Sequence, residues 1–449
     1  MLTRWLYPGL GLKRWAILSG VGVGIVVVGL WNIINNRLAK DFTYAVFRWF
    51  NAHLPHLSFY QGLFCALVGL IFILWCFAMT VSRYMKMTYG KTGLDDYYKN
   101  VSRSQGPNIV AIGGGTGLSV LLKGLKVYTS NITAAVTVGD DGGSSGRLRE
   151  EFGVVPVGDI RNCIVALADE ERVMETLFNY RFSAGSALKG HTLGNLLLLA
   201  MTNITGNFQD AVSGIDDVLH ISGKVLPITN VPLILEANFK SGRTVRGESY
   251  LSKVNEPIVK LNVLPEKATI LPEVMESIRE ADVIILGPGS LYTSVIPNLC
   301  VKGVVEAIQE SKARVVYVCN VVTQVGETLG YTAGDHLQAI INHSDMNFID
   351  YIVVDDGFLS KSIKLSDQIK QGSEPVYIDE EYIESLGVKI LRGILSSSEN
   401  PYRHDSDILA QVIIKGLYHD RYFYKKRGIA KSFWDYQKFK SYFTKEENK

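Results

Sequence analysis

The 449-residue sequence contains only five cysteines, and no two of them are spaced as Cys-x-x-Cys. This scarcity argues against a structural zinc site and against a disulfide framework, and it fits reduced thiols in the cytosol. Net charge is also small, because 46 Lys and Arg residues face 44 Asp and Glu residues, which leaves +2. A chain with so small a net charge has no overall electrostatic field that would attract nucleic acid, so nucleic acid is not an expected partner. The length predicts more than one structural unit.

Charge is absent altogether from two long N-terminal stretches, residues 15–34 and 57–81. Each is long enough, as a helix, to cross the hydrocarbon core of a membrane. Basic residues are more frequent in the N-tail and after the second stretch than in the connector, which places both ends in the cytoplasm. We therefore predict a transmembrane helical hairpin and linker over residues 1–105, in a multi-pass membrane protein. A pair of buried core helices is the alternative.

From residue 108 onward, short apolar runs alternate with stretches of helical period. Strands are predicted at residues 108–112, 132–138, 282–286, 314–318 and 351–354. Continuous apolar strands separated by helices indicate an α/β fold, a mostly parallel sheet with helices on both faces. Residues 225–262 alternate without a helical pattern and predict a small antiparallel insertion. The predicted main domain is residues 106–410.

The stretch VAIGGGTGLSVLLKGL, residues 110–125, places glycines where the first strand ends and a helix begins. Free backbone N–H groups at a helix start form a phosphate site, and the missing Cβ atoms let a phosphate approach. We predict diphosphate binding by Gly113, Gly114, Gly115, Thr116 and Gly117. The spacing is not the regular GxGxxG of dinucleotide sites, and no Gly-Lys-Ser/Thr follows as in a Walker motif. A tight turn that packs the helix on the strand is the alternative.

The next predicted strand ends in GDDGGSSG, residues 139–146. An acidic residue at this position of a Rossmann-type sheet binds a ribose hydroxyl. Two adjacent carboxylates also suit a divalent ion such as Mg²⁺ beside a diphosphate. Asp140 and Asp141 are therefore the predicted metal ligands, and an Asx-turn is the alternative.

Three further stretches supply candidate ligand-binding residues. In PVGDIRN, Asp159 is a third candidate carboxylate and Arg161 a fork for a phosphate. In GHTLGN, His191 and Asn195 lie at a predicted helix start. The stretch LGPGSLYTSVIPN follows an apolar strand and offers a second anion cradle of backbone donors and hydroxyls. Its predicted contacts are Gly287, Gly289, Ser290, Thr293 and Ser294.

These stretches, in this order, resemble the gluconeogenesis factor (YvcK-type) family. The resemblance includes AIGGGTGLSVLLKGLK, VTVGDDGGSSGRLREEFG, PVGDIRNCIVALAD, GHTLGNLLLLAM, GKVLPIT, GPGSLYTSVIPNL and NVVTQVGET, within residues 106–400. That family is related to 2-phospho-L-lactate transferase (CofD-like). The resemblance implies a Rossmann-like domain that binds a nucleotide sugar, typically UDP-N-acetylglucosamine, and takes part in control of carbon metabolism, cell wall and cell shape. A regulatory protein partner and a bacterial cell are implied as well.

The transferase relatives imply a second function, a Mg²⁺-dependent transferase acting on a nucleoside-diphosphate-linked substrate. Asp140, Asp141 and Asp159 would then be the catalytic carboxylates, because positioning and charge neutralisation suffice for phosphoryl chemistry. An NAD-dependent dehydrogenase fits less well because the glycine spacing is irregular. Nucleophilic hydrolysis fits least, since Gly-Pro-Gly-Ser at residues 287–290 lacks the GxSxG elbow.

The C-terminal tail, residues 411–449, is rich in aromatic and basic residues. That composition suits docking at a membrane interface, and it also suits single-stranded nucleic acid or a terminal helix packed on the body. Membrane docking is the preferred interpretation because a membrane hairpin is already predicted. A homodimer is the default expectation for the assembly.

Overall fold

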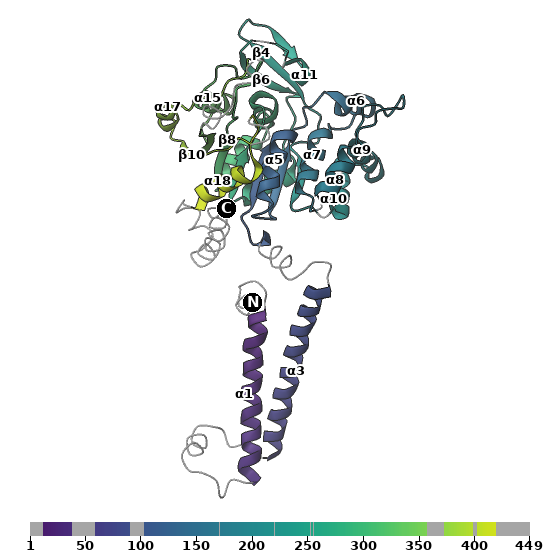
Figure 1. Cartoon of the computed structure of the whole chain (residues 1–449), viewed down its shortest axis with the longest axis vertical. Coiled ribbons are helices and arrows are strands. Elements are labelled where there is room, and N and C mark those ends of the chain that lie inside the picture. The colour runs from purple at the N-terminus through teal and green to yellow at the C-terminus, as the bar shows by residue number, and fades with distance from the viewer. Residues whose placement is uncertain are drawn as a thin grey trace. The chain divides into compact units, whose positions relative to one another are not determined.

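The computed structural model describes residues 12–37, 59–89, 103–169, 171–219, 221–251, 253–254, 256–356, 372–397 and 402–418 (Figure 1). The chain divides into two units, Met1–Ser104 and Gln105–Lys449, which are described separately. Residues 38–58, which include most of the predicted connector, lie outside the described residues, as do most of the predicted linker and the tail from residue 419.

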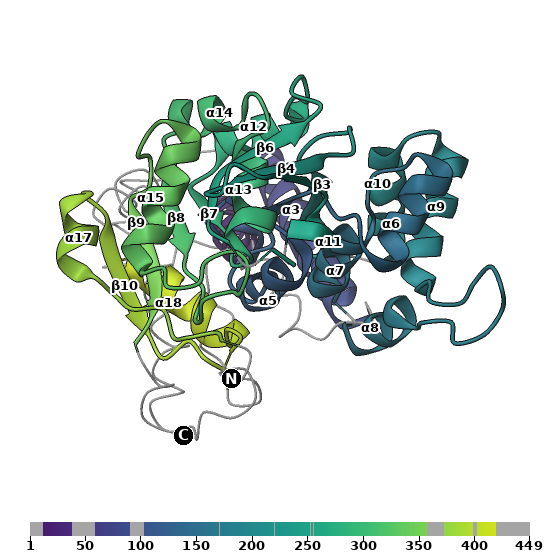
Figure 2. The same cartoon turned by 90° about the horizontal axis from the view of Figure 1, so that it is seen from above.

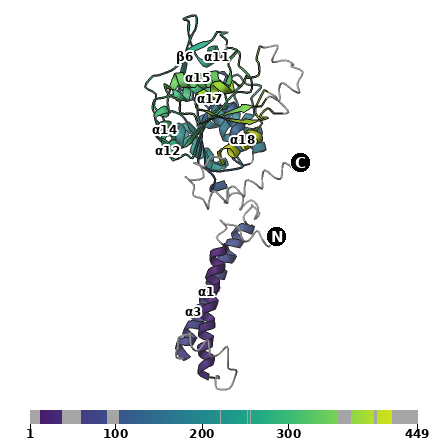
Figure 3. The ribbon, with the colours of Figure 1, turned by 90° about the vertical axis from the view of Figure 1, so that its left-hand side faces the viewer.

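The described part of the N-terminal unit includes two long helices, α1 (Leu12–Arg37) and α3 (Phe59–Tyr89), which lie side by side (Figure 3). Glycines allow the two backbones to approach closely. A Cβ atom on Gly69 would fall 2.7 Å from a methyl group of Val26 and 2.9 Å from its backbone nitrogen. A larger residue at position 69 would therefore push the helices apart.

Both helices extend beyond the predicted spans and include charged residues, such as Lys13 in α1 and Arg83 in α3. Within the described residues, no helix has both the length and the apolar character needed to cross a membrane. The predicted transmembrane spans at residues 15–34 and 57–81 are therefore not supported.

The second unit is built around a seven-stranded sheet in which every pair of neighbours is parallel (Figure 2). The strands are β1 (Ile109–Gly113), β2 (Ile132–Val136), β3 (Lys224–Pro227), β7 (Val283–Leu286), β8 (Arg314–Val318), β9 (Tyr351–Asp355) and β10 (Lys389–Gly393). Their order is β10-β9-β8-β7-β1-β2-β3. Strands β1 and β7 are buried along their whole length, as expected for a parallel sheet covered on both faces.

Helices cover both faces of this sheet, with α5, α7 and α18 on one face and α12 and α14 on the other (Figure 2). The helices are α5 (Gly115–Leu125), α6 (Gly143–Phe152), α7 (Gly158–Leu167), α8 (Glu171–Asn179), α9 (Leu193–Thr205), α10 (Phe208–Leu219), α12 (Pro272–Glu280), α13 (Ile296–Leu299), α14 (Val304–Glu310), α15 (Ala333–Ser344), α17 (Glu380–Ser385), α18 (Ser406–Tyr418) and the π-helical turn η2 (Leu291–Val295). The predicted α/β architecture with a mostly parallel sheet is confirmed.

The small antiparallel sheet has the order β5-β4-β6 and is formed by β4 (Ile234–Phe239), β5 (Thr244–Arg246) and β6 (Ile258–Leu264). A short helix, α11 (Glu248–Leu251), lies between β5 and β6. The antiparallel sheet begins at Ile234, later than the start of the predicted insertion, residues 225–262. Strand β3 pairs in parallel with β2, and three of its four residues are buried without alternation.

Helix α18 runs from Ser406 to Tyr418 and so continues past the predicted domain boundary at residue 410. It packs against α5, where a Cβ atom on Gly124 would lie 2.8 Å from the Ala410 side chain. Residues 411–418 are therefore part of the α/β body, and the rest of the predicted tail lies outside the described residues.

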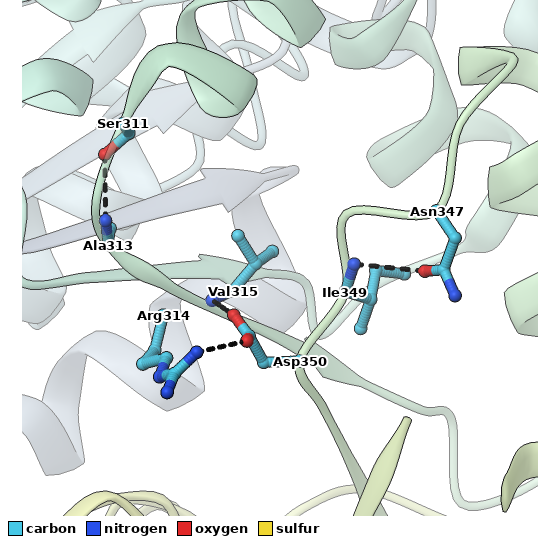
Figure 4. Close-up of polar contacts among 7 residues, drawn as sticks. All are labelled: Ser311, Ala313, Arg314, Val315, Asn347, Ile349 and Asp350. Carbon is cyan, nitrogen blue, oxygen red and sulfur yellow. Dashed lines mark hydrogen bonds and ion pairs between the residues drawn. The ribbon is translucent and has the colours of Figure 1, made fainter. Parts of the chain in front are cut away.

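The amino ends of β8 and β9 are joined by Asp350 (Figure 4). Its carboxylate accepts the Val315 N–H at 2.8 Å and pairs with the Arg314 guanidinium at 2.7 Å. Local turns lead into both strands, since Ser311 Oγ accepts the Ala313 N–H and Asn347 Oδ1 accepts the Ile349 N–H. Such side-chain bonds to the backbone two residues on are typical of tight turns.

Removing this carboxylate should destabilise the body. In Asp350→Ala, the Val315 N–H and the Arg314 guanidinium lose their shared acceptor, which is expected to cost about 2 kcal/mol of unfolding free energy. Urea unfolding followed by fluorescence measures the loss. Asp350→Asn is the matched control because it keeps an acceptor oxygen and should lose less. An unchanged midpoint in the alanine variant would contradict this role.

Candidate functional site

The strand order reverses between β1 and β7, because the chain adds β2 and β3 on one side and β8, β9 and β10 on the other. In doubly wound sheets, ligands bind at the carboxyl ends of the strands at such a switch point. The predicted glycine loops follow β1 and β7, so they meet there. A Cβ atom on Gly113 would lie 3.6 Å from Gly287 Cα, and one on Gly117 would lie 2.9 Å from Gly289 Cα.

The loop after β1 is packed against an acidic side chain. Asp159, at the start of α7, accepts the Gly115 N–H, and a Cβ atom on Gly115 would overlap this aspartate. Gly114 faces both Asp159 and Ser294, whose Oγ lies 2.5 Å from the position a Cβ would take. Thr116 is exposed in the first turn of α5. The glycines are therefore needed for close approach, but the amide predicted to face a diphosphate already contacts a carboxylate.

Asp140 and Asp141, in the loop after β2, have different partners. Asp140 accepts the Gly142 N–H at 2.9 Å and contacts Ser145. Asp141 instead accepts the Ser249 N–H at 2.9 Å and so holds the start of α11. In the part of the chain that the structure describes, no three His, Cys, Asp or Glu side chains are grouped to hold a metal ion. A Mg²⁺ ion here would need oxygens from a ligand or from water, which is its usual coordination in nucleotide sites.

Two glutamates join these aspartates, the half-buried Glu248 and the buried Glu327, and neither was predicted. Glu248 begins α11, and its pKa is raised to about 9, first by burial and then by Asp140, Asp159, Glu327 and Asp141. Burial also raises the pKa of Glu327 to about 7 and that of Asp159 to about 6. The pKa of Asp140 is raised by the same cause. The site at the switch point is therefore lined with carboxyl groups that resist ionisation.

A buried hydrogen-bonded network surrounds His191. Ser144 Oγ lies 2.9 Å from His191 Nδ1 and accepts a bond of 3.0 Å from Asn195 Nδ2. Ser144 Oγ has one hydrogen and two lone pairs, so it can accept from Asn195 and still bond His191 in either direction, according to the tautomer of the imidazole. Burial and then Arg147 lower the pKa of His191, which favours the neutral imidazole.

Ser144 also lies in Gly-Gly-Ser-Ser-Gly, residues 142–146, which matches the GxSxG pattern. The side chain does not form an open nucleophile. One lone pair of Ser144 Oγ accepts from Asn195, and the residue is only 6% exposed. The network therefore links α6 to the start of α9.

Arg161 belongs to the same network. Its Nη1 group donates to Thr192 Oγ1 at 2.6 Å and to Asn195 Oδ1 at 3.1 Å, and its Nη2 group donates to Asn162 Oδ1 at 2.8 Å. Only Nε is buried with no partner among the described residues. The predicted fork for a phosphate is thus largely committed to protein oxygens, and its main role here is to orient Asn195.

The loop after β7 leads into η2, and its three hydroxyl side chains differ in exposure. Ser290 and Ser294 are half-buried, whereas Thr293 is only 4% exposed. The structure therefore brings together the glycine loop, Asp140, Asp159, Gly287, Gly289, Ser290 and Ser294. His191, Asn195 and Arg161 form an adjacent network next to Ser145 and Asp140. The sequence gives no strong signal that Glu248 and Glu327 belong to the site, since each lies in a stretch where a glutamate is usually a surface residue.

The strand order and the converging glycine loops define a Rossmann-like α/β protein with its candidate site at the switch point. The chain belongs to the CofD family, because residues 109–395 match the family described as 2-phospho-L-lactate transferase CofD. The predicted family relationship is confirmed.

Among its relatives, the gluconeogenesis factor of Halalkalibacterium halodurans is 48% identical over 310 residues, covering 69% of this chain and 96% of the relative. The gluconeogenesis factor of Bacillus subtilis is 47% identical over 311 residues, covering 69% and 98%. A relative from Clostridium acetobutylicum is 41% identical over 446 residues, covering 97% and 96%, so this match includes the N-terminal unit. A crystal structure of a UPF0052-family protein from Bacillus halodurans has a TM-score of 0.65 at 47% identity, covering 69% of this chain and 99% of that one.

Proposed function

We propose that the chain binds a nucleoside-diphosphate sugar at the switch point, with UDP-N-acetylglucosamine as the ligand. The observation that carries this proposal is the convergence of the loops after β1, β2 and β7 at one edge of the sheet. Backbone amides and small hydroxyls at such an edge suit a pyrophosphate. The carboxyl groups there favour a ligand that arrives with Mg²⁺, because an unaccompanied diphosphate would be repelled.

In this proposal, the chain is a regulator that links carbon metabolism to cell-wall synthesis and cell shape. Support comes from the relatives named gluconeogenesis factor and from the resemblance of the sequence to that family. The regulatory partner would be another protein, which binds the surface of the ligand-bound body. A homodimer stays a prediction.

The alternative proposal is a Mg²⁺-dependent transferase acting on a nucleoside-diphosphate-linked substrate. The family match to 2-phospho-L-lactate transferase favours it, as does the carboxyl group of Asp140 near Asp159 at the switch point. Bound Mg²⁺ would neutralise the diphosphate, while Asp140 and Asp159 would hold the ion and orient the acceptor.

One experiment separates the two functions. The full-length chain is incubated with UDP-N-acetylglucosamine and Mg²⁺, and both its melting temperature and the amount of intact ligand are measured. A higher melting temperature with intact ligand supports the regulator, since a ligand that binds the folded state stabilises it. Catalytic loss of the ligand supports the transferase. Asp140→Ala should weaken either activity, and no effect of any uridine nucleotide would contradict both proposals.

We also propose that the N-terminal unit contacts a bacterial membrane and keeps the α/β body in the cytoplasm. Support comes from large apolar side chains that stay exposed on α1 and α3, including Val21, Phe64, Ile71 and Phe77, of which the last three are 64–68% exposed. An apolar surface of this kind in a lipid-free setting would favour aggregation.

Charges placed on this surface should release the chain from lipid. In the triple variant Phe64→Lys, Ile71→Lys and Phe77→Lys, the fraction that floats with anionic vesicles is expected to fall at least fivefold, because each lysine is costly to bury in hydrocarbon. Val173→Lys is the matched control, since Val173 is an exposed apolar residue of the body at 62%. Flotation of the triple variant at the unchanged level would contradict membrane contact through these helices.

A further inference from the structure

The segment that follows β8, residues 320–328, contacts the loop after β7 through two side chains. Gln324 Nε2 donates to Ser290 Oγ at 2.9 Å. Glu327 accepts the Tyr292 N–H at 3.2 Å and lies 3.4 Å from Thr293 Oγ1, which donates to it. We call residues 320–328 the strap. Every one of these contacts falls on the candidate ligand loop, so the strap determines how that loop presents its polar groups.

The strap is held by hydrogen bonds between its own residues and by an outside residue, Glu374. Asn320 Nδ2 donates to Gln324 Oε1 at 3.1 Å, which leaves the Gln324 amide nitrogen to face Ser290. The Gln324 N–H donates to Thr328 Oγ1 at 2.9 Å. Thr323 exchanges two bonds with Glu374, one through its backbone N–H at 2.7 Å and one through its hydroxyl at 2.9 Å. A segment held by these bonds can impose one hydrogen-bond pattern on its neighbour.

A hydroxyl group has one hydrogen to donate, so each contact with the strap decides where that hydrogen goes. Ser290 Oγ accepts from Gln324, and its own hydrogen is free to point away from the strap. Thr293 donates its hydroxyl hydrogen to Glu327, and the Thr293 side chain is buried. The two hydroxyls that the sequence suggested as equivalent are therefore different in the structure.

We infer that the strap selects the ligand-contacting hydroxyl of this loop: Ser290 donates to an acceptor oxygen of the bound ligand, whereas Thr293 is turned to the protein. Gln324 is then a positioning residue, acting through Ser290. This inference rests on the proposed nucleotide-sugar site and deepens it. It also replaces the prediction that Thr293 contacts the anion.

The first test compares the two hydroxyls by calorimetric titration of the full-length chain with UDP-N-acetylglucosamine in MgCl₂. Ser290→Ala should raise the Kd about tenfold, as expected for loss of a hydrogen bond to a charged group. Thr293→Val should raise the Kd much less, within about twofold. Ser385→Ala, an exposed serine of α17, is the control for serine removal. Melting curves confirm that each variant is folded.

The second test changes the strap and leaves the loop intact. In Gln324→Glu, the new carboxylate would take the Ser290 hydrogen, so the Kd should rise about as much as in Ser290→Ala. Gln324→Leu removes the partner without capturing that hydrogen, and the Kd should rise less. If Gln324 had a purely structural role, the Kd would rise more in Gln324→Leu than in Gln324→Glu, because leucine loses the contact with Ser290 that glutamate keeps.

The outcomes are distinguishable. Equal weakening by Thr293→Val and Ser290→Ala, or wild-type affinity in Gln324→Glu, overturns the inference and leaves the nucleotide-sugar site in place. Failure of the unmodified chain to bind the probe overturns the proposed function, and this inference with it.

Discussion

Alanine at position 117 is expected to lower the melting temperature strongly and to weaken ligand binding. The added Cβ atom would fall 2.7 Å from the Pro288 carbonyl carbon and 2.9 Å from Gly289 Cα, and it would overlap the Pro288 oxygen. These are backbone atoms, which cannot rotate away as a flexible side chain can. The loops after β1 and β7 would have to separate, at a cost of about 3 kcal/mol. Binding should fall at least tenfold, because both loops form the candidate site.

Gly113, the last residue of β1, supplies a control substitution for Gly117→Ala. Gly113→Ala adds a Cβ atom that meets Gly287 Cα at 3.6 Å and the Leu118 side chain at 3.7 Å, which are ordinary contact distances. Its melting temperature should therefore stay close to that of the unmodified chain. Differential scanning fluorimetry of both variants, followed by titration with UDP-N-acetylglucosamine, tests the argument. Equal melting temperatures for the two variants would show that the two loops are not in close contact at Gly117.

Much of this site follows from sequence because its parts are local. Apolar, β-branched runs predict the strands, and glycines at their ends predict where backbone must approach closely. A parallel α/β sheet then brings the ends of β1, β2 and β7 to one edge, whatever the details of packing. The convergence of the loops that carry Gly115, Asp140 and Ser290 could therefore be expected before any coordinates.

The partners of individual side chains do not follow in the same way. Asp159 contacts Gly115, and Asp141 contacts Ser249, across separations in sequence that no local pattern encodes. Glu248 enters the site from the antiparallel insertion, whose alternating pattern only predicts strands with one exposed face. Such contacts depend on how separate elements pack, and a single sequence carries little information about that.

These side-chain contacts change the chemical description of the site. Glycine-rich loops alone predict free amides ready for an anion. In the structure, Asp159 is bonded to the amide of Gly115, and Glu327 is bonded to that of Tyr292. An anionic ligand must therefore meet carboxyl groups that are either protonated or screened by a cation. Stability and binding should consequently depend on pH and on Mg²⁺.

The free energy of unfolding is expected to fall as pH rises, in buffer without Mg²⁺. Burial raises the pKa of Asp159 to about 6, of Glu327 to about 7 and of Glu248 to about 9, so the folded chain binds protons that the unfolded chain has released. Their stabilising contribution is complete below about pH 4 and is lost between there and about pH 9, as each folded-state pKa is passed. Mg²⁺ binds ionised carboxylates, so it should restore more stability at pH 8 than at pH 5.

Glu248→Gln isolates the largest of these shifts. Glutamine needs no proton to stay neutral, so the variant should be more stable than the unmodified chain at pH 8, by on the order of 2 kcal/mol, and nearly equal to it near pH 4. Melting temperatures measured from pH 4 to pH 9 give the comparison, and Glu384→Gln, an exposed glutamate of α17, is the control. If Glu248→Gln melts at the same temperature as the unmodified chain at pH 8, Glu248 is an ordinary solvated carboxylate. The insertion then contributes no acid with a raised pKa to the site, and a diphosphate would meet a smaller barrier there.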